Sequence, residues 1–297
     1  MKALRWIRAS QAILFEASIA PAFVGTAAAI RAGARFDGLW FALILLSLIG
    51  IQAGANLFKG YFEAHDRRGP PAAPGSWFAF DSGAAVDLGR HPRSVMRLGY
   101  ACFLLGLSAG LVLVVLTRNV VLIAFGAAGA LLAWSYSSPP LKLSYRGVGE
   151  LSTFAAFGPI MTVGATIAFG GAGLRDSVLA SMILGFLASA ISFARYFPNR
   201  DEDVTKGKRT PVTVLGLRTA RVLLFGVLIA PLLIGIVWIP SGGGVVWFAA
   251  LALCALLLVR GFPATVSPTG WERMIALTIA THGAVAAALI IDLLLGL

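Results

Sequence analysis

The segment from Asn199 to Gly216 brings acids and bases close together between two strongly apolar stretches of the chain. Its charged side chains include three carboxylates, which are hard oxygen ligands of the kind that Mg²⁺ prefers. The basic residues that follow them offer donors that hold a phosphate ester. These six residues are Asp201, Glu202, Asp203, Lys206, Lys208 and Arg209. The pattern predicts metal-assisted chemistry on a lipid diphosphate at a membrane surface.

A second cluster of polar residues lies earlier in the chain, with the spacing of one helix face. Asn56, Lys59, Glu63 and Asp66 follow one another by three, four and three residues, so a continuing helix would stack them on one side. Acids at a membrane surface are often only solvated loop charges, but two clusters with adjacent bases favour a site. The predicted ligands for one or two Mg²⁺ ions are Asn56, Glu63, Asp66, Asn199, Asp201 and Asp203.

Basic residues near both clusters predict a clamp for the diphosphate. The pair Pro139-Pro140 should end a helix and leave an extended bend, which places Lys142 and Arg146 at the rim. The alternative is that these two residues only anchor the loop on the positively charged side of the membrane. The predicted diphosphate ligands are Arg67, Lys142, Arg146, Lys208 and Arg209, and the predicted catalytic residues are Lys59, Glu63 and Asp203.

Apolar spans must position these residues. The 297 residues are 58% hydrophobic and 12% charged, which excludes an ordinary soluble protein. A spanning helix needs about 20 mostly apolar residues, and nine stretches fit that requirement. They are residues 12–30, 38–58, 95–116, 119–136, 150–171, 177–197, 221–240, 245–260 and 273–296. The predicted fold is all-α, a single membrane domain over residues 1–297 with about nine transmembrane helices and two long connections, 59–94 and 199–219.

The distribution of lysine and arginine predicts the orientation of these helices. With a cytoplasmic N-terminus, twenty of the 24 basic residues fall on the cytoplasmic side. The other side keeps only Arg31, Arg35, Arg118 and Arg175. We therefore expect a protein integral to the cytoplasmic (inner) membrane, with its active site facing the cytoplasm. The net charge of +11 would meet membrane lipids with anionic headgroups and anionic substrates there, and we expect no nucleic-acid partner.

Three segments, together with the nine spans, resemble the UbiA superfamily of intramembrane prenyltransferases over nearly the whole chain. They are the Asn-led stretch after the second span, YSSPPLKLSYRGVGE after the fourth and NRDEDVTKGKRTPVTVLG after the sixth. The segment from Tyr136 to Pro159 and the run Gly207–Thr210 look most like the menaquinone-type (dihydroxynaphthoate) branch, whereas NRDED resembles the hydroxybenzoate branch. The resemblance implies transfer of a prenyl group from a prenyl diphosphate to an aromatic acceptor, with Mg²⁺ between the two acidic motifs.

The acidic motifs of this chain depart from the pattern of that superfamily. The first motif has the form N-D-x-x-D, and the matching positions here are Lys59, Gly60 and Glu63. In the second motif the first acid is Asn199, while Asp203 keeps the second. Asp66 and Asp201 are the candidates to replace the lost ligands. A lysine in the place of a metal-binding asparagine suggests the hypothesis that the Lys59 ammonium stands in for one Mg²⁺ at the diphosphate.

The expected function is thus Mg²⁺-dependent transfer of a prenyl group to an aromatic, quinone-precursor-like acceptor. Loss of two acids supports an alternative, a catalytically weakened protein of the same fold that binds an isoprenoid or quinone as a carrier or partner subunit. A transporter is less favoured because the spans are almost free of ionisable residues near the midplane. The acceptor, the prenyl chain length, the number of metals and the oligomeric state stay open.

Overall fold

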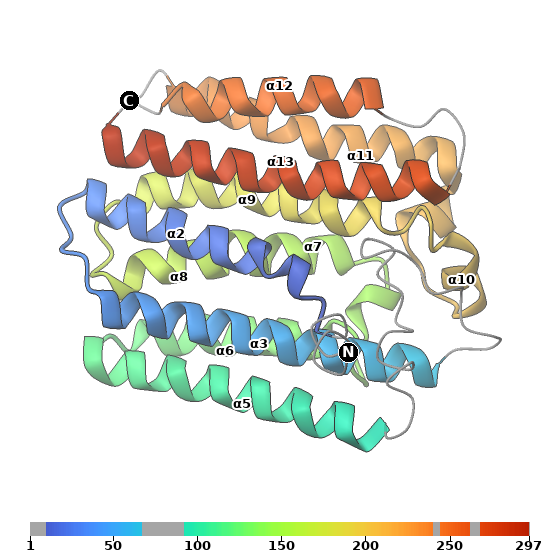
Figure 1. Cartoon of the computed structure of the whole chain (residues 1–297), viewed down its shortest axis with the longest axis horizontal. Coiled ribbons are helices and arrows are strands. Elements are labelled where there is room, and N and C mark those ends of the chain that lie inside the picture. Colours follow the sequence, from blue (N-terminus) through green and yellow to red (C-terminus); the bar gives the residue numbers. More distant parts are fainter. Residues whose placement is uncertain (1–9, 67–91, 240–243, 262–267, 297) are drawn as a thin grey trace.

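The computed structural model describes residues 10–66, 92–239, 244–261 and 268–296, and all the regular structure in these ranges is helical. Long helices run side by side along the longest axis of the molecule (Figure 1). The elements are η1 (Ala12–Leu14), α2 (Glu16–Arg31), α3 (Gly38–His65), α5 (Pro92–Thr117), α6 (Val121–Ser135), η2 (Leu143–Tyr145), α7 (Gly149–Ala155), η3 (Ala156–Ile160), α8 (Met161–Ala168), α9 (Leu174–Ala194), α10 (Arg200–Thr205), α11 (Pro211–Trp238), α12 (Val246–Gly261) and α13 (Pro268–Leu295).

Each of the nine predicted spans is helical, but they differ in length. Within the described ranges, seven helical segments are long and apolar enough to cross a membrane. The other two, α6 and α12, are shorter apolar helices of 15 and 16 residues. At 1.5 Å per residue they measure about 23 Å, which is less than a hydrocarbon core of about 30 Å. The all-α membrane architecture is therefore confirmed, at seven full-length spans plus two short helices.

The structure corrects both predicted long connections. Helix α3 continues to His65, so Lys59 and Glu63 lie on its last turns, as the continuing-helix prediction requires. The segment 199–219 is not one loop, because it contains α10 and the start of α11. Thr210 caps α11 by accepting a hydrogen bond from the Thr213 amide, and Pro211 fits the first turn. Residues 67–91 of the first connection lie outside the described residues.

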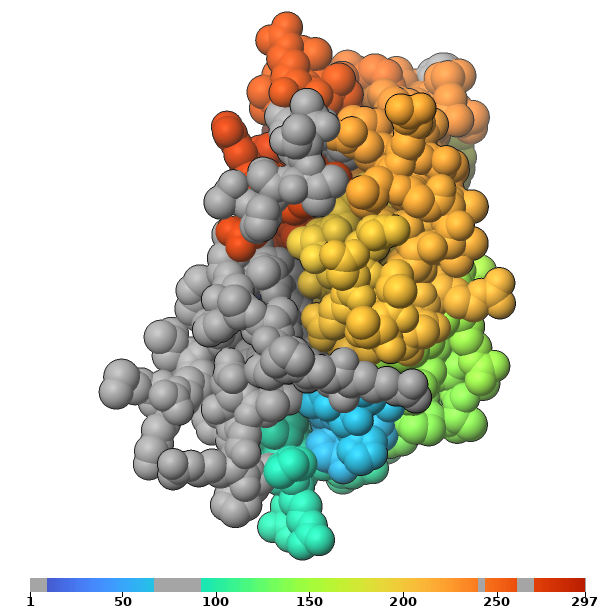
Figure 2. All heavy atoms as spheres, turned by 90° about the vertical axis from the view of Figure 1, so that its right-hand side faces the viewer, coloured from blue at the N-terminus to red at the C-terminus, as the bar shows by residue number. Residues whose placement is uncertain are grey.

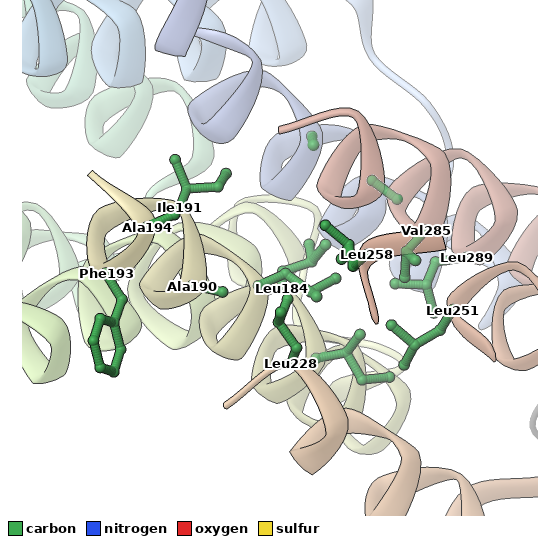
Figure 3. Packing of buried hydrophobic residues seen from close by; sticks show 14 of the residues in the cluster. Leu184, Ala190, Ile191, Phe193, Ala194, Leu228, Leu251, Leu258, Val285 and Leu289 are labelled. Atoms are coloured by element: carbon green, nitrogen blue, oxygen red, sulfur yellow. The ribbon is translucent and has the colours of Figure 1, made fainter. Parts of the chain in front are cut away.

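The main hydrophobic core lies on one side of α9. Leu184 of α9, Leu228 of α11 and Leu251 of α12 are buried together with Leu289 of α13 (Figure 3). Helices α11, α12 and α13 thus form one edge of the bundle, and α3, α5 and α6 form the opposite edge (Figure 1). The α9 helix separates this packed core from a more open region beside α3 and α6, where the candidate site lies.

A close contact between α2 and α8 holds the two regions together. A Cβ atom at Gly25 would lie 2.1 Å from the backbone oxygen of Thr162, and the Thr166 hydroxyl donates to the Gly25 carbonyl at 2.8 Å. We expect Gly25→Ala to destabilise the protein by about 1–3 kcal/mol through overpacking. Thermal unfolding in detergent measures this, with Gly226→Ala as the control, because nothing lies within 4 Å of a Cβ at Gly226. Equal melting temperatures of the two variants would contradict it.

Candidate functional site

Two adjoining spaces lie between α3 and α9. The larger is an apolar cavity of about 400 Å³ bounded by α3, α5, α6, the α7–η3–α8 run and α9. The smaller is a polar pocket of about 30 Å³, lined from the end of α3, the end of α9 and α10. Four residues line both, namely Lys59, Tyr136, Ser192 and Arg195. The polar pocket is thus the polar end of a mostly apolar chamber.

Figure 2 views the end of the molecule that carries α10, where the segment from Arg195 to Thr210 (yellow to gold) lies between α3 (blue) and α11 (orange). The residues that line the polar pocket beyond the four shared ones come from α3 and from this segment. They are Glu63, Tyr196, Asn199, Glu202, Asp203, Lys206 and Lys208. Both predicted clusters therefore contribute to one pocket, although they are more than 130 residues apart in the chain.

The centre of the pocket is a lysine held between two carboxylates. The Lys208 Nζ lies 2.6 Å from Glu63 Oε1 and 3.3 Å from Asp203 Oδ1. All three side chains are buried, with Glu63 4% and Asp203 3% exposed. Removing one member of such a buried group leaves an uncompensated charge, so the three act as a unit.

A glycine turn after α10 places Lys208 beside Asp203. The Lys208 amide donates to the Asp203 carbonyl at 2.9 Å, and the Gly207 amide donates to the Val204 carbonyl at 3.0 Å. These two bonds form a Schellman motif, in which Gly207 takes the left-handed conformation with φ 69°. The Arg209 amide then donates to the Tyr145 carbonyl at 3.0 Å, which joins the GKRT run to the segment after α6.

Three further cationic side chains surround this centre. Lys206 Nζ lies 2.5 Å from Glu202 Oε1 and 4.0 Å from Glu63 Oε2. Arg195 is buried at the end of α9, and Lys59 lies one helical turn before Glu63 on α3. With Lys208 these make four cationic residues against the three carboxylates of Glu63, Glu202 and Asp203 in the pocket lining. The pocket is thus suited to an anion.

Burial and the neighbouring charges set the protonation of the centre. Burial raises the pKa of Asp203 above its usual range, although the Lys208 ammonium opposes this effect. Burial alone would lower the pKa of Lys208, but the carboxylates of Glu63 and Asp203 outweigh it and raise the pKa. Lys208 therefore stays charged at neutral pH. Burial also raises the pKa of Tyr145, whose ring centroid lies 4.9 Å from Lys208 Nζ, so this phenol stays neutral.

Some of the predicted residues lie outside the polar pocket. Asp66 pairs with Lys142 at 2.5 Å, at the rim, and the Asn56 amide donates to the Ser10 carbonyl at 2.8 Å beside the apolar cavity. Asp201 pairs with Arg200, and its side chain is 93% exposed.

Of the four predicted diphosphate ligands that the structure describes, only Lys208 lines the pocket. The Arg146 guanidinium donates to the Pro140 carbonyl, and Arg209 is exposed. Arg67 lies outside the described residues. The structure therefore brings together Lys59, Glu63, Asn199, Asp203 and Lys208 from the whole predicted set.

Sequence reasoning missed several pocket residues at the end of α9. Ser192, Arg195 and Tyr196 line the pocket beside the predicted Asn199, and these three later residues lie three, four and seven positions after Ser192, as on one helix face. That spacing was a usable signal. The sequence analysis predicts neither Arg195 nor Lys206 as a ligand of the diphosphate, and the structure places both in the pocket lining.

The number of carboxylate ligands in the pocket limits how many divalent cations it can bind. Among the described residues no group of three or more His, Cys, Asp or Glu side chains is arranged to hold a metal ion. Glu63 and Asp203 nevertheless face one cation together, and Asp203 Oδ2 is buried without a hydrogen-bond partner there. Two carboxylates, completed by water and phosphate oxygens, are a usual environment for one Mg²⁺. The pocket fits one such ion.

Comparisons with known proteins agree with this architecture. The chain is 30% identical to the chloroplastic 2-carboxy-1,4-naphthoquinone phytyltransferase of Arabidopsis thaliana, over 70% of this chain and 54% of that protein. It is 29% identical to the 1,4-dihydroxy-2-naphthoate octaprenyltransferase of Mycobacterium tuberculosis, over 75% of this chain and 74% of that one. The chain thus spans about half of the plant relative and about three quarters of the mycobacterial one.

A solved structure shows the same fold. A UbiA homologue from Archaeoglobus fulgidus bound to GPP and Mg²⁺ superposes with a TM-score of 0.64, at 16% identity, over 95% of this chain and 99% of that chain. Residues 89–273 match the family described as the UbiA prenyltransferase family, which is well over half of the sequence. This multi-pass membrane protein therefore belongs to the UbiA prenyltransferase family.

Proposed function

We propose that this protein transfers a prenyl group from a prenyl diphosphate to an aromatic acceptor in the membrane, and that it needs Mg²⁺. The main support for this function is that the apolar cavity and the polar pocket adjoin and share four lining residues. The apolar cavity suits an isoprenoid chain, and the cationic pocket that opens from it suits a diphosphate. The reacting carbon–oxygen bond would lie between them, beside Lys59, Tyr136, Ser192 and Arg195.

The acceptor we propose is a bicyclic naphthoate. The two relatives named above are described by naphthoquinone and dihydroxynaphthoate substrates, and the resemblance of the Tyr136–Pro159 segment points to the same branch. Such an acceptor is planar and largely apolar, so it can enter the cavity with the prenyl chain. Tyr136 and Ser192 offer hydroxyls at the junction, and their oxygens lie 3.4 Å apart. These hydroxyls are suited to orient the ring hydroxyls of the acceptor.

Several residues of the polar pocket would together promote ionisation of the prenyl diphosphate. Glu63 and Asp203 would hold one Mg²⁺, which neutralises charge on the departing diphosphate when it is bound. Lys206, Lys208 and Arg195 would bind the remaining phosphate oxygens. The allylic carbon–oxygen bond breaks and leaves its electron pair on the diphosphate. A ring carbon of the acceptor then forms the new carbon–carbon bond, and the proton that it carried passes to the released diphosphate, while the apolar cavity walls exclude water.

We also propose the orientation and the location of the protein. The chain would form one membrane domain with nine spans, α6 and α12 included, in the cytoplasmic membrane, with a cytoplasmic N-terminus. The excess of basic residues supports this orientation. The polar pocket would then face the cytoplasm.

A turnover assay with the purified protein in nanodiscs tests the proposal. The protein is incubated with Mg²⁺, prenyl diphosphates of several lengths and a panel of aromatic acceptors, and both diphosphate and prenylated product are measured. We expect equal amounts of the two with a naphthoate acceptor, and loss of both with EDTA. Tight binding of the prenyl lipid without any diphosphate release would instead favour the alternative of a carrier or partner subunit.

A further inference from the structure

Lys59 occupies the point where the apolar cavity meets the polar pocket. It lines both spaces, and it lies one turn before Glu63 on α3. Lysines 206 and 208 line only the polar pocket. Among the lysines of the site, Lys59 is therefore the one placed beside the bond that joins an apolar chain to its diphosphate.

Lys59 also differs from the other lysines of the site in its contacts. Lys142, Lys206 and Lys208 each form an ion pair with a carboxylate. Lys59 makes no hydrogen bond or ion pair with any residue that the structure describes. Lys59 is half-buried at the lining of both spaces, and an ammonium there that no carboxylate pairs is suited to bind an anionic group of a ligand.

The carboxylates of the pocket are too few for two divalent cations. Glu202 is held by Lys206, which leaves Glu63 and Asp203 as the pair that can share a metal. With four cationic residues against three carboxylates, the pocket already carries excess positive charge. A second divalent cation would add to this excess without gaining further acidic ligands.

We propose that the Lys59 ammonium takes the place of a second divalent cation, so that the site works with one metal ion; this inference rests on the proposed function. Lys59 contacts the diphosphate oxygen that is bonded to the allylic carbon. When that bond breaks, the electron pair stays on this oxygen, and the ammonium stabilises the charge that develops there. Lys59 transfers no proton and remains an ammonium throughout. It is a catalytic residue in the strict sense, because it touches the reacting atoms.

Binding of a prenyl thiolodiphosphate, a donor whose carbon–sulfur bond ionises poorly, tests this inference without turnover. Its affinity is measured over a range of Mg²⁺ concentrations, and the number of bound Mn²⁺ ions per chain is measured by electron paramagnetic resonance with the compound present. The variants are Lys59→Met, which keeps the length of the side chain but removes its charge, and Lys59→Arg, which keeps the charge. Arg218→Met is the control, because Arg218 is an exposed basic residue of α11 outside the pocket.

We expect one Mn²⁺ per wild-type chain. Lys59→Met should weaken binding of the thiolodiphosphate about 10- to 100-fold, as expected for a lost charge-assisted contact, and Lys59→Arg should restore most of it. Arg218→Met should bind as the wild type does. The weakening in Lys59→Met should be largest at low Mg²⁺, where the built-in charge matters most.

Two outcomes would overturn the inference while leaving the proposed function intact. One is two Mn²⁺ ions per wild-type chain, and the other is an unchanged affinity of Lys59→Met at every Mg²⁺ concentration. A wild-type protein that neither binds the thiolodiphosphate nor turns over a prenyl diphosphate would overturn the proposed function as well. Metal counting and turnover therefore separate the two failures.

Discussion

Asp203→Asn should lower kcat/KM for diphosphate release by about 10²- to 10³-fold, the range expected when one preorganised charged group of an active site is lost. The substitution keeps the size of the side chain but removes the charge that, with Glu63, holds the shared cation. It also leaves Lys208 with a single carboxylate partner. Initial rates in nanodiscs, over a range of Mg²⁺ concentrations, measure the loss. Part of the activity should return at high Mg²⁺ because Glu63 still offers one carboxylate.

Asp201→Asn is the matched control for this experiment. Asp201 lies two residues away on the same short helix, but its side chain is 93% exposed and pairs with Arg200. We expect its kcat/KM to stay within about threefold of the wild type, since exposed ion pairs contribute little. An equal loss in both variants would show that α10 binds metal in another arrangement. An unchanged rate in Asp203→Asn would remove Asp203 from the proposed site.

The membrane-spanning helices could be predicted from the sequence because each needs about 20 mostly apolar residues. The ends of these helices were predicted less well, because hydropathy does not show where a helix ends once it continues beyond the apolar region. Helix α3 continues seven residues beyond the predicted end of its span, to His65, and therefore includes Lys59 and Glu63. Helix α11 begins after its cap Thr210, well before its apolar part. Cap and turn residues, rather than hydropathy, determine those boundaries.

The candidate site could be predicted only in part because its contacts are tertiary. Glu63 and Lys208 are separated by 145 residues, and nothing in their local sequence says which of several lysines Glu63 will meet. Lys142, an equally plausible partner, pairs with Asp66 at the rim instead. Arg195 enters the pocket because α9 ends beside α10, which is a packing result. Residue types and helical spacing therefore predicted the kind of site, but tertiary packing determines which residues line it.

The apolar cavity predicts a second large effect, on the length of prenyl chain that the protein accepts. Thr153 lies at the polar end, where its hydroxyl is 3.3 Å from that of Ser192. Gly164 lines the same cavity eleven residues further along the α7–η3–α8 run, which is about 16 Å at 1.5 Å per residue. A side chain at Gly164 would first meet the Phe125 ring, at 3.4 Å from its Cβ. A large side chain there would fill the deep part of the cavity and leave the polar pocket unchanged.

Gly164→Phe should therefore lower kcat/KM for geranylgeranyl and longer diphosphates by about 10- to 100-fold, because each displaced apolar group is worth 1–3 kcal/mol. Dimethylallyl and geranyl diphosphates should react at nearly the wild-type rate, because their chains end before Gly164. Competition between short and long donors in one reaction, read by mass spectrometry of the products, measures the ratio directly. Gly164→Ala is the control, since its Cβ makes only an ordinary contact. Equal losses with short and long donors would mean that the prenyl chain leaves the site by another path, and that this cavity holds the acceptor or lipid.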